Sequence, residues 1–159
     1  MHRRLARSLT AAAVPMSLLM TDGAFAINHR DKVALDQTAY CIYEEAVLQD
    51  PTKGDPRLLG ILDSYKGNCS TTAKHATGWL AQGFWLLYSS SYDGKQGICR
   101  ASKDWSYNTK PTSSFTVNAL IEEPPPCKEG WYETRAFGWL YYNDKWVGGY
   151  VNSGRYRLT

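Results

Sequence analysis

Four cysteines constrain the fold of this chain more than any other feature. Cys41, Cys69, Cys99 and Cys127 are separated by 28, 30 and 28 residues. An even number of cysteines in a short exported chain predicts a disulfide framework, and four cysteines allow three pairings. We favour Cys41–Cys69 with Cys99–Cys127, because neighbours in sequence meet at the lowest entropic cost. No two cysteines are close enough to form a Cys-x₂₋₄-Cys motif, so we expect no zinc site.

Residues 1–26 have the pattern of a secretory signal peptide, which is why we expect the cysteines to be oxidised. Three arginines among the first seven residues are followed by the short apolar stretch Leu9–Met20, and the segment ends in the small-x-small cleavage pattern Ala-Phe-Ala. The apolar stretch is shorter than the ~20 residues that a membrane-spanning helix needs. The sequence therefore predicts a secreted protein, extracellular or periplasmic. Its mature chain would begin near Ile27 and have no stable membrane insertion.

The mature chain, residues 27–159, has the size of a single domain. Taking the 26 leader residues from 159 leaves 133. The leader also removes three arginines and Asp22, so 18 basic residues become 15, 15 acidic residues become 14, and the net charge falls from +3 to +1. No basic run remains, which argues against a nucleic-acid partner, since such binding depends on phosphate neutralisation.

The first part of this domain, residues 27–77, is expected to be helical. Asp31 can cap a first helix, because the apolar residues of 33–47 fall largely at three- and four-residue intervals. Asp55-Pro56 is a good start for a second helix over 58–65, with aspartate as the cap and proline in the first turn. The pattern predicts a short N-terminal helical hairpin, which must pack on the rest of the chain to be stable.

The second part, residues 78–159, has the pattern of a β structure. It holds 17 of the 20 aromatic residues of the mature chain, including all six tryptophans. Phe84–Tyr88 is apolar on both faces, as in a central strand, and 115–121 alternates like a half-buried strand. A C-terminal meander turns at Asn143-Asp144. The expected fold class is α+β: the helical hairpin packs on an antiparallel, mostly β barrel or sandwich stapled by two disulfides.

Few residues point to catalysis. The chain lacks the motifs of serine hydrolases, zinc proteases and phosphate-binding loops, and we expect no cofactor. His75 has no nucleophile motif beside it and is expected at the surface, while Glu44 and Glu45 are expected on an exposed helix face. A glycan hydrolase would need two carboxylates across a cleft. The candidates, all in turn-like or charged surroundings, are Asp104, Glu122, Glu123, Glu133 and Asp144.

Aromatic residues are the better indication of function. Trp105 and Tyr107 have only polar neighbours, and in an extended chain both would project from one side. Tyr92 lies at a predicted hairpin tip. We predict that these three form an exposed ligand-binding cluster, because flat aromatic side chains with a polar tip are typical of binding surfaces. Other large aromatic residues have apolar neighbours and are assigned to the core: Phe84, Trp85, Phe115, Phe137 and Trp139.

The segment from Gly130-Trp131 to Gly138-Trp139-Leu140-Tyr141 resembles bacterial SH3-type modules that bind cell walls, which repeat Gly-Trp pairs on short strands. The likeness carries no binding residues across, and the expected helical pair has no counterpart in that family.

Function is therefore expected to be recognition. The leading hypothesis is a secreted, non-catalytic binding module for an extracellular glycan or another secreted protein. In the protein case, the proline-rich loop Glu122–Lys128 favours an inhibitor, since a stiff segment loses less entropy on binding. The alternative is a small secreted glycan hydrolase that uses carboxylates, and a third hypothesis is an interaction or coat protein without a discrete ligand.

Overall fold

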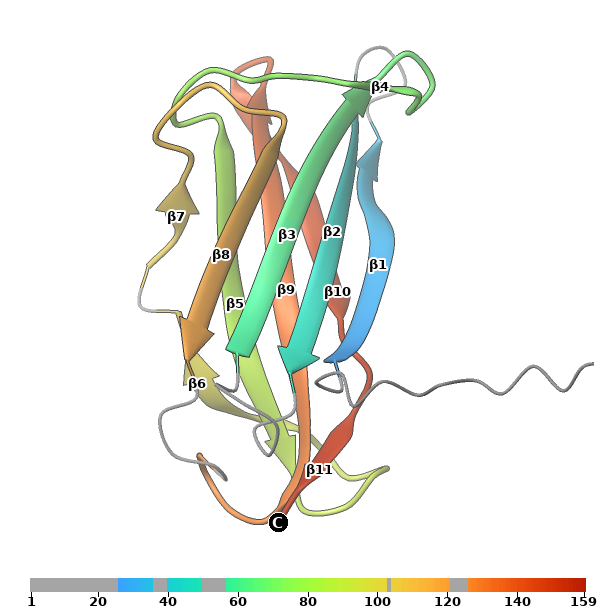
Figure 1. The fold of residues 1–159 in the computed structure, drawn as a ribbon, viewed down its shortest axis with the longest axis vertical. Coiled ribbons are helices and arrows are strands. Elements are labelled where there is room, and N and C mark those ends of the chain that lie inside the picture. The colour runs from blue at the N-terminus through green and yellow to red at the C-terminus, as the bar shows by residue number, and fades with distance from the viewer. Residues whose placement is uncertain (1–25, 36–39, 50–56, 103, 121–125) are drawn as a thin grey trace, which may run out of the picture.

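The structure, a computed structural model, describes residues 26–35, 40–49, 57–102, 104–120 and 126–159. Every regular element in these residues is a β-strand. The strands form two antiparallel sheets that face each other, so that the molecule is a β-sandwich (Figure 1). We call them the front sheet and the back sheet, as they lie in Figure 1.

The front sheet has five strands, and its first three follow one another as a meander. The long β3 pairs with β2 along one edge, and its other edge is shared by β8 and the short β4. The strands are β1 (Ala26–Leu35), β2 (Tyr40–Gln49), β3 (Arg57–Lys66), β4 (Thr71–Thr72) and β8 (Ser114–Leu120).

The back sheet has six strands around a central pair, β5 and β9. β9 also pairs with β10 and β11, and β5 also pairs with β6 and β7. The strands are β5 (Leu80–Ser89), β6 (Gly97–Ala101), β7 (Ser106–Tyr107), β9 (Gly130–Tyr142), β10 (Lys145–Asn152) and β11 (Tyr156–Leu158).

The predicted helical hairpin is wrong, and with it the α+β class. Its expected helices form β1, β2 and β3, and Asp31, the expected helix cap, lies within β1. Alternate residues of β2, Ile42 to Leu48, face the core with a period of two. The sequence does not show this two-residue period, because the polar Glu44 occupies a core-facing position. An apolar residue, Val47, occupies an outward-facing one and is buried as well. Asp55-Pro56 lies outside the described residues.

The expected β elements of the second part are confirmed where the structure describes them. Phe84–Tyr88 lies in the central strand β5, and residues 115–120 lie in β8. The turn at Asn143-Asp144 joins β9 to β10, with positive φ angles of 48° and 58°. Such angles suit the tight turns whose twist matches that of the paired strands.

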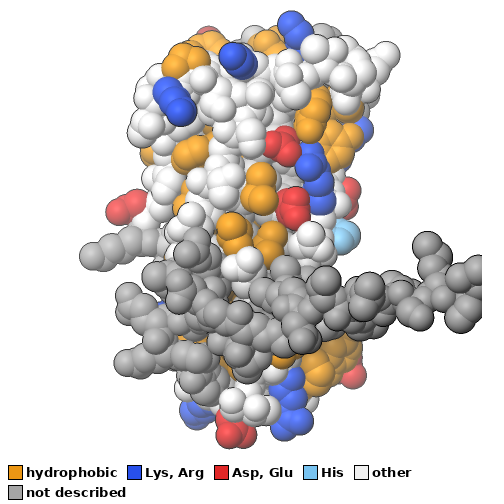
Figure 2. Space-filling model, in the orientation of Figure 1, with side chains coloured by type: hydrophobic (Ala, Val, Ile, Leu, Met, Phe, Trp, Pro, Cys, Tyr) orange, Lys and Arg blue, Asp and Glu red, His pale blue; other side chains and the backbone are white. Residues whose placement is uncertain are grey.

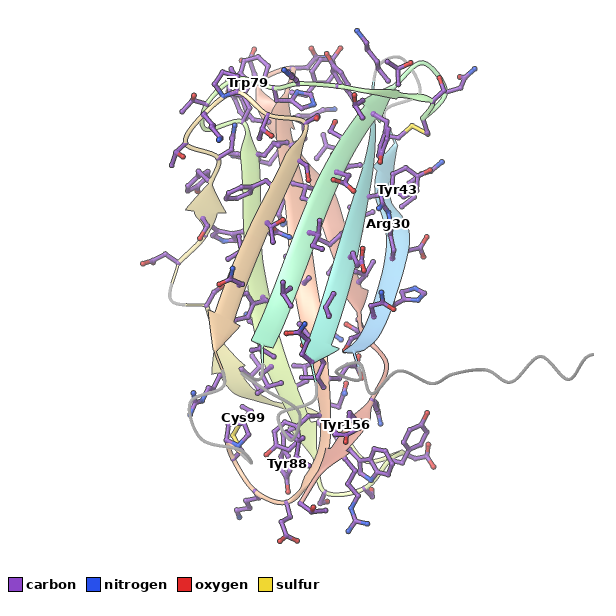
Figure 3. The ribbon with its side chains drawn as sticks, viewed as in Figure 1. Arg30, Tyr43, Trp79, Tyr88, Cys99 and Tyr156 are labelled. Carbon is purple, nitrogen blue, oxygen red and sulfur yellow. A yellow bond between two sulfur atoms is a disulfide. The ribbon has the colours of Figure 1, made fainter. Side chains whose placement is uncertain are left out.

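Both disulfides pair as predicted, Cys41 with Cys69 and Cys99 with Cys127. The first links the start of β2 to the turn that follows β3. The second links β6 to the segment before β9, at the lower end of the view in Figure 3, where Cys99 is labelled. Each ring would stabilise the fold by roughly 3–4 kcal/mol on a loop-entropy estimate.

Apolar side chains fill the space between the sheets. One cluster lies toward the lower end and includes Leu48, Leu86 and Tyr132, and another contains Ile42, Leu62, Leu80 and Leu140. Because this core takes alternate residues of each strand, the remaining residues of the back sheet project outward from the sandwich. That outward row is where the aromatic residues collect.

Candidate functional site

The outer face of the back sheet carries a layer of aromatic side chains, which we call the aromatic face. In β9, Ala136 and Leu140 are buried in the core, so alternation places Phe137, Trp139 and Tyr141 on the opposite side. Neighbouring strands and loops add further rings beside them. The aromatic face consists of Trp79, Trp85, Trp105, Tyr107, Phe137, Trp139, Tyr141, Trp146 and Tyr150.

These rings pack against one another in two groups, one around Tyr141 and one around Trp105 and Phe137. The Tyr141 ring centroid lies 6.1 Å from that of Trp79 and 5.4 Å from that of Trp146. Trp105 lies 6.3 Å from Trp139, with the two ring planes near a right angle at 83°. Edge-to-face and tilted pairs of this kind are favourable beyond their buried area. The rings therefore hold one another in place without closing over the surface.

The front sheet has a different outer surface. Figure 2 shows Lys, Arg, Asp and Glu side chains interspersed with hydrophobic ones on this side of the molecule. Arg30 forms a 2.8 Å ion pair with Asp63 and lies 5.4 Å above the ring of Tyr43 (Figure 3). The charge of Arg30 is thus paired with Asp63, and its guanidinium lies over one of the aromatic rings on this side. Among the described residues, the front face has no comparable set of open aromatic rings.

Two hollows lie on either side of Trp105 and together form what we call the Trp105 groove. The first, of about 340 Å³, is walled by four rings and Ala81. The second, of about 220 Å³, combines rings with polar side chains. The rings of the first hollow are Trp105, Tyr107, Trp139 and Trp146, and the second is lined by Gly83, Phe84, Trp85, Ser102, Asp104, Trp105 and Phe137.

A glycine seats the central ring of the groove. A Cβ atom built on Gly83 would lie 3.5 Å from Cε3 and 3.6 Å from Cζ3 of Trp105. The indole thus rests directly on the strand backbone at Gly83, while 45% of the Trp105 residue remains exposed. An indole supported from below and open above is a ready platform for stacking a flat ligand.

The predicted binding residues are all exposed, but they do not form one cluster. Trp105 and Tyr107 line the first hollow together. Tyr92, 55% exposed, lies elsewhere: its ring centroid is 4.9 Å from that of Trp131, and the Arg155 guanidinium is 5.7 Å from its ring. The structure therefore places Tyr92 outside the Trp105 groove, and a binding role stays a prediction for all three residues.

The sequence reasoning missed the rest of the groove. Phe84 is buried as expected, but Trp85, Phe137 and Trp139 lie half-buried on the outer face rather than in the core. Trp146, which is 41% exposed, was not singled out at all. The sequence does contain an indication of this aromatic face: Phe137, Trp139 and Tyr141 alternate with small or aliphatic residues, so in a strand they share one face.

His75 is buried, not at the surface as expected. Only 4% of the residue is exposed, and its Nε2 lies 2.7 Å from Oγ of Ser64. Its backbone N–H donates to the carbonyl of Thr112, and the Tyr40 ring packs against the imidazole at 4.8 Å. Burial lowers the pKa of His75. Because Ser64 is itself 1% exposed, the serine–histidine pair is out of reach of a substrate.

Glu44 is also buried, contrary to its expected place on an exposed helix face. One carboxylate oxygen accepts a 2.6 Å hydrogen bond from Nε2 of Gln82, which crosses from β5 of the back sheet. The other oxygen has no partner among the described residues. Burial raises the pKa of Glu44 to about 8. Gly60 and Gly138 leave the space that the carboxyl group fills, since a Cβ at either would contact it.

The carboxylates considered for a hydrolase are not assembled into a site by the described residues. Glu133 accepts hydrogen bonds from Gln96 at 2.7 Å and from Arg155 at 3.1 Å. Asp144 lies in the β9–β10 turn and accepts a 3.4 Å hydrogen bond from the hydroxyl of Tyr141. Asp104 lines the second hollow of the groove without an acidic neighbour there. Glu122 and Glu123 lie outside the described residues.

Comparison with known proteins gave no relatives: no family model, no curated protein and no solved structure matches this chain significantly. Among the described residues there is no metal-ligating group of three or more His, Cys, Asp and Glu side chains. Nor do they include a helix with the length and apolar character needed to cross a membrane. The Trp105 groove is therefore the strongest candidate site.

Proposed function

We propose that this protein is a secreted, non-catalytic binding module that recognises an extracellular glycan through the Trp105 groove. The observation that carries this proposal is the Trp105 indole, which packs against the backbone at Gly83 while 45% of the residue stays exposed. Monomeric proteins rarely leave a contiguous patch of aromatic surface uncovered without a binding role.

Two features favour a glycan over a protein partner. The open ring faces of Trp105 and Trp146 match the flat apolar faces of sugar rings, which stack on aromatic side chains. Polar groups lie within the same groove: Ser102 and Asp104 line the second hollow, and Tyr107, whose side chain ends in a hydroxyl, lines the first. An apolar site with a few placed polar groups is the usual form of a specific small-ligand site.

Replacing Trp105 with alanine is expected to weaken glycan binding at least tenfold, because a central aromatic anchor carries a large share of the binding energy. The mature protein would be tested for retention on chitin, cellulose and peptidoglycan. Titration of tryptophan fluorescence with soluble fragments of whichever polymer retains it would give the dissociation constant. Circular dichroism would check that the variant keeps its fold.

Tyr92→Ala is the matched control, since Tyr92 is as exposed as Trp105 but lies outside the groove. It should bind like the unaltered protein. Retention on a polysaccharide that survives Trp105→Ala would contradict a role for the groove. Absence of retention on every polysaccharide, with binding to a secreted protein instead, would replace the glycan with a protein ligand.

We further propose that the protein is secreted and that cleavage after Ala26 releases the mature chain. The two disulfides support an oxidising compartment. The first described strand begins at Ala26, so cleavage there would leave β1 almost whole. N-terminal sequencing of the protein from the culture medium of its source should begin at Ile27. An intact mass that retains Met1, or four thiols that react without reduction, would contradict this proposal.

A further inference from the structure

Asp104 is the one charged side chain among the described residues that line the second hollow of the Trp105 groove. The other lining side chains, among them Trp85, Trp105, Phe137 and Ser102, are uncharged. No ion pair or hydrogen bond to the Asp104 carboxylate is found among the described residues. The hollow therefore presents a carboxylate among four aromatic residues.

Arg100 and Arg135 are two described cations in strands beside this hollow, and neither of them lines it. Arg100 lines a wider hollow between β6 and β8, which Asp104 also borders, and neither hollow of the groove. Arg100 and Asp104 form no ion pair. Arg135 pairs across the sheet with Trp85 but lines neither hollow; it lies 4.5 Å over the Tyr150 ring and donates a 2.8 Å hydrogen bond to Asn152.

This chemistry selects for a positive charge on the ligand. A cation beside an indole face is attracted by the negative face of the ring, and a neighbouring carboxylate adds a charge-assisted hydrogen bond. An anionic group placed in the same hollow would be repelled by Asp104 and would find no cation among its described lining residues. The first hollow has four rings and no charged residue, so it favours a neutral, flat unit instead.

Building on the proposed function, we infer that the Trp105 groove binds an amino-sugar glycan of at least two units, one of which places a free amine against Asp104. One sugar unit stacks in the four-ring hollow, and the amine-bearing unit lies across Trp105 in the second hollow. Asp104 is thus a specificity-determining residue, and Trp105 supports both units.

The test compares a tetramer of glucosamine with a tetramer of N-acetylglucosamine, which has the same length but no free amine. Titration of tryptophan fluorescence near pH 6 and low salt should show roughly tenfold tighter binding of the free-amine tetramer. The preference should shrink as salt is added, since screening weakens exposed charge pairs. Asp104→Asn should abolish the preference and leave binding of the acetylated tetramer unchanged.

Asp93→Asn is the control, because Asp93 is an exposed aspartate in the β5–β6 loop outside the groove; it should keep the full preference. Equal binding of the two tetramers, or tighter binding of the acetylated one, would overturn the amine inference and leave the proposed glycan function standing. A preference that survives Asp104→Asn would also overturn it. Failure of both tetramers and of the polysaccharides named above would overturn the glycan function itself.

Discussion

Glu44→Gln is expected to make the protein more stable at alkaline pH and to remove the loss of stability that Glu44 causes between about pH 4.5 and 8. The carboxyl group lies between the sheets with one hydrogen-bond partner, Gln82, and burial raises its pKa to about 8. An ionised carboxylate there would be a buried charge without a cation, which is costly. The amide of glutamine has nearly the same shape and cannot ionise.

The sign follows from proton linkage. Between the unfolded pKa, near 4.5, and the folded value, about 8, the folded protein keeps a proton on Glu44 that the unfolded chain has lost. The free energy of unfolding therefore falls as pH rises, by up to about 1.4 kcal/mol per pH unit. Over the whole window the loss from this group is roughly 3–5 kcal/mol. Below pH 4.5 both states hold the proton and the difference disappears.

Urea unfolding at pH 5, 6, 7, 8 and 9 with intact disulfides measures this effect. Glu45→Gln is the control, because Glu45 is the next residue of β2, faces outward and accepts a 3.0 Å hydrogen bond from Asn28. In that variant the free energy of unfolding should change with pH as it does in the unaltered protein. A Glu44→Gln variant with the same slope as the unaltered protein would show that Glu44 does not titrate in this window.

Gly138→Ala is expected to lower the free energy of unfolding by roughly 1–3 kcal/mol, as overpacking a filled core does. A Cβ at Gly138 would lie 2.2 Å from Oε2 of Glu44 and 2.7 Å from Cδ1 of Leu62. The carboxyl group is held on its other side, where Oε1 accepts a 2.6 Å hydrogen bond from Gln82. The clash therefore displaces β9 or breaks the hydrogen bond to Gln82.

Gly97→Ala provides the control for this substitution, because a Cβ at Gly97 would meet no atom within 4 Å. It should leave the urea midpoint nearly unchanged. A double-mutant cycle separates crowding from other effects: Glu44→Ala opens space, so Gly138→Ala should cost less in that background. If Gly138→Ala lowers the free energy of unfolding equally with and without Glu44→Ala, then Glu44 is not the group displaced.

Local patterns predicted the parts of this protein that depend on neighbours in sequence. The disulfide pairing followed from the cysteines' order in the chain, since neighbours in sequence meet at the lowest entropic cost. The β9–β10 turn followed from Asn143-Asp144, whose side chains tolerate the positive φ that the turn requires. The exposure of Trp105 and Tyr107 followed from their polar surroundings. Each of these features is decided within a few residues or by loop length.

The wrong predictions, the helical hairpin and the surface position of His75, concern features that depend on residues far apart in the sequence. Glu44 breaks the alternation of β2, and without it residues 33–47 fit a helical period as well as a strand period. Only pairing with β1 and β3 makes residues 40–49 a strand, and only Gln82 and two glycines from other strands accommodate the carboxyl group. His75 was misplaced for the same reason, since Ser64, Tyr40 and Thr112 bury it from distant positions.

The amino-acid sequence alone determined the covalent framework, the tight turns and the abundance of aromatic residues in the second part of the chain. The tertiary structure decided which face of the back sheet those rings occupy, and that Trp105 rests on Gly83 beside Trp139. The physical reason is that strand pairing is non-local: register between β5, β7, β9 and β10 brings the rings of distant segments onto one surface.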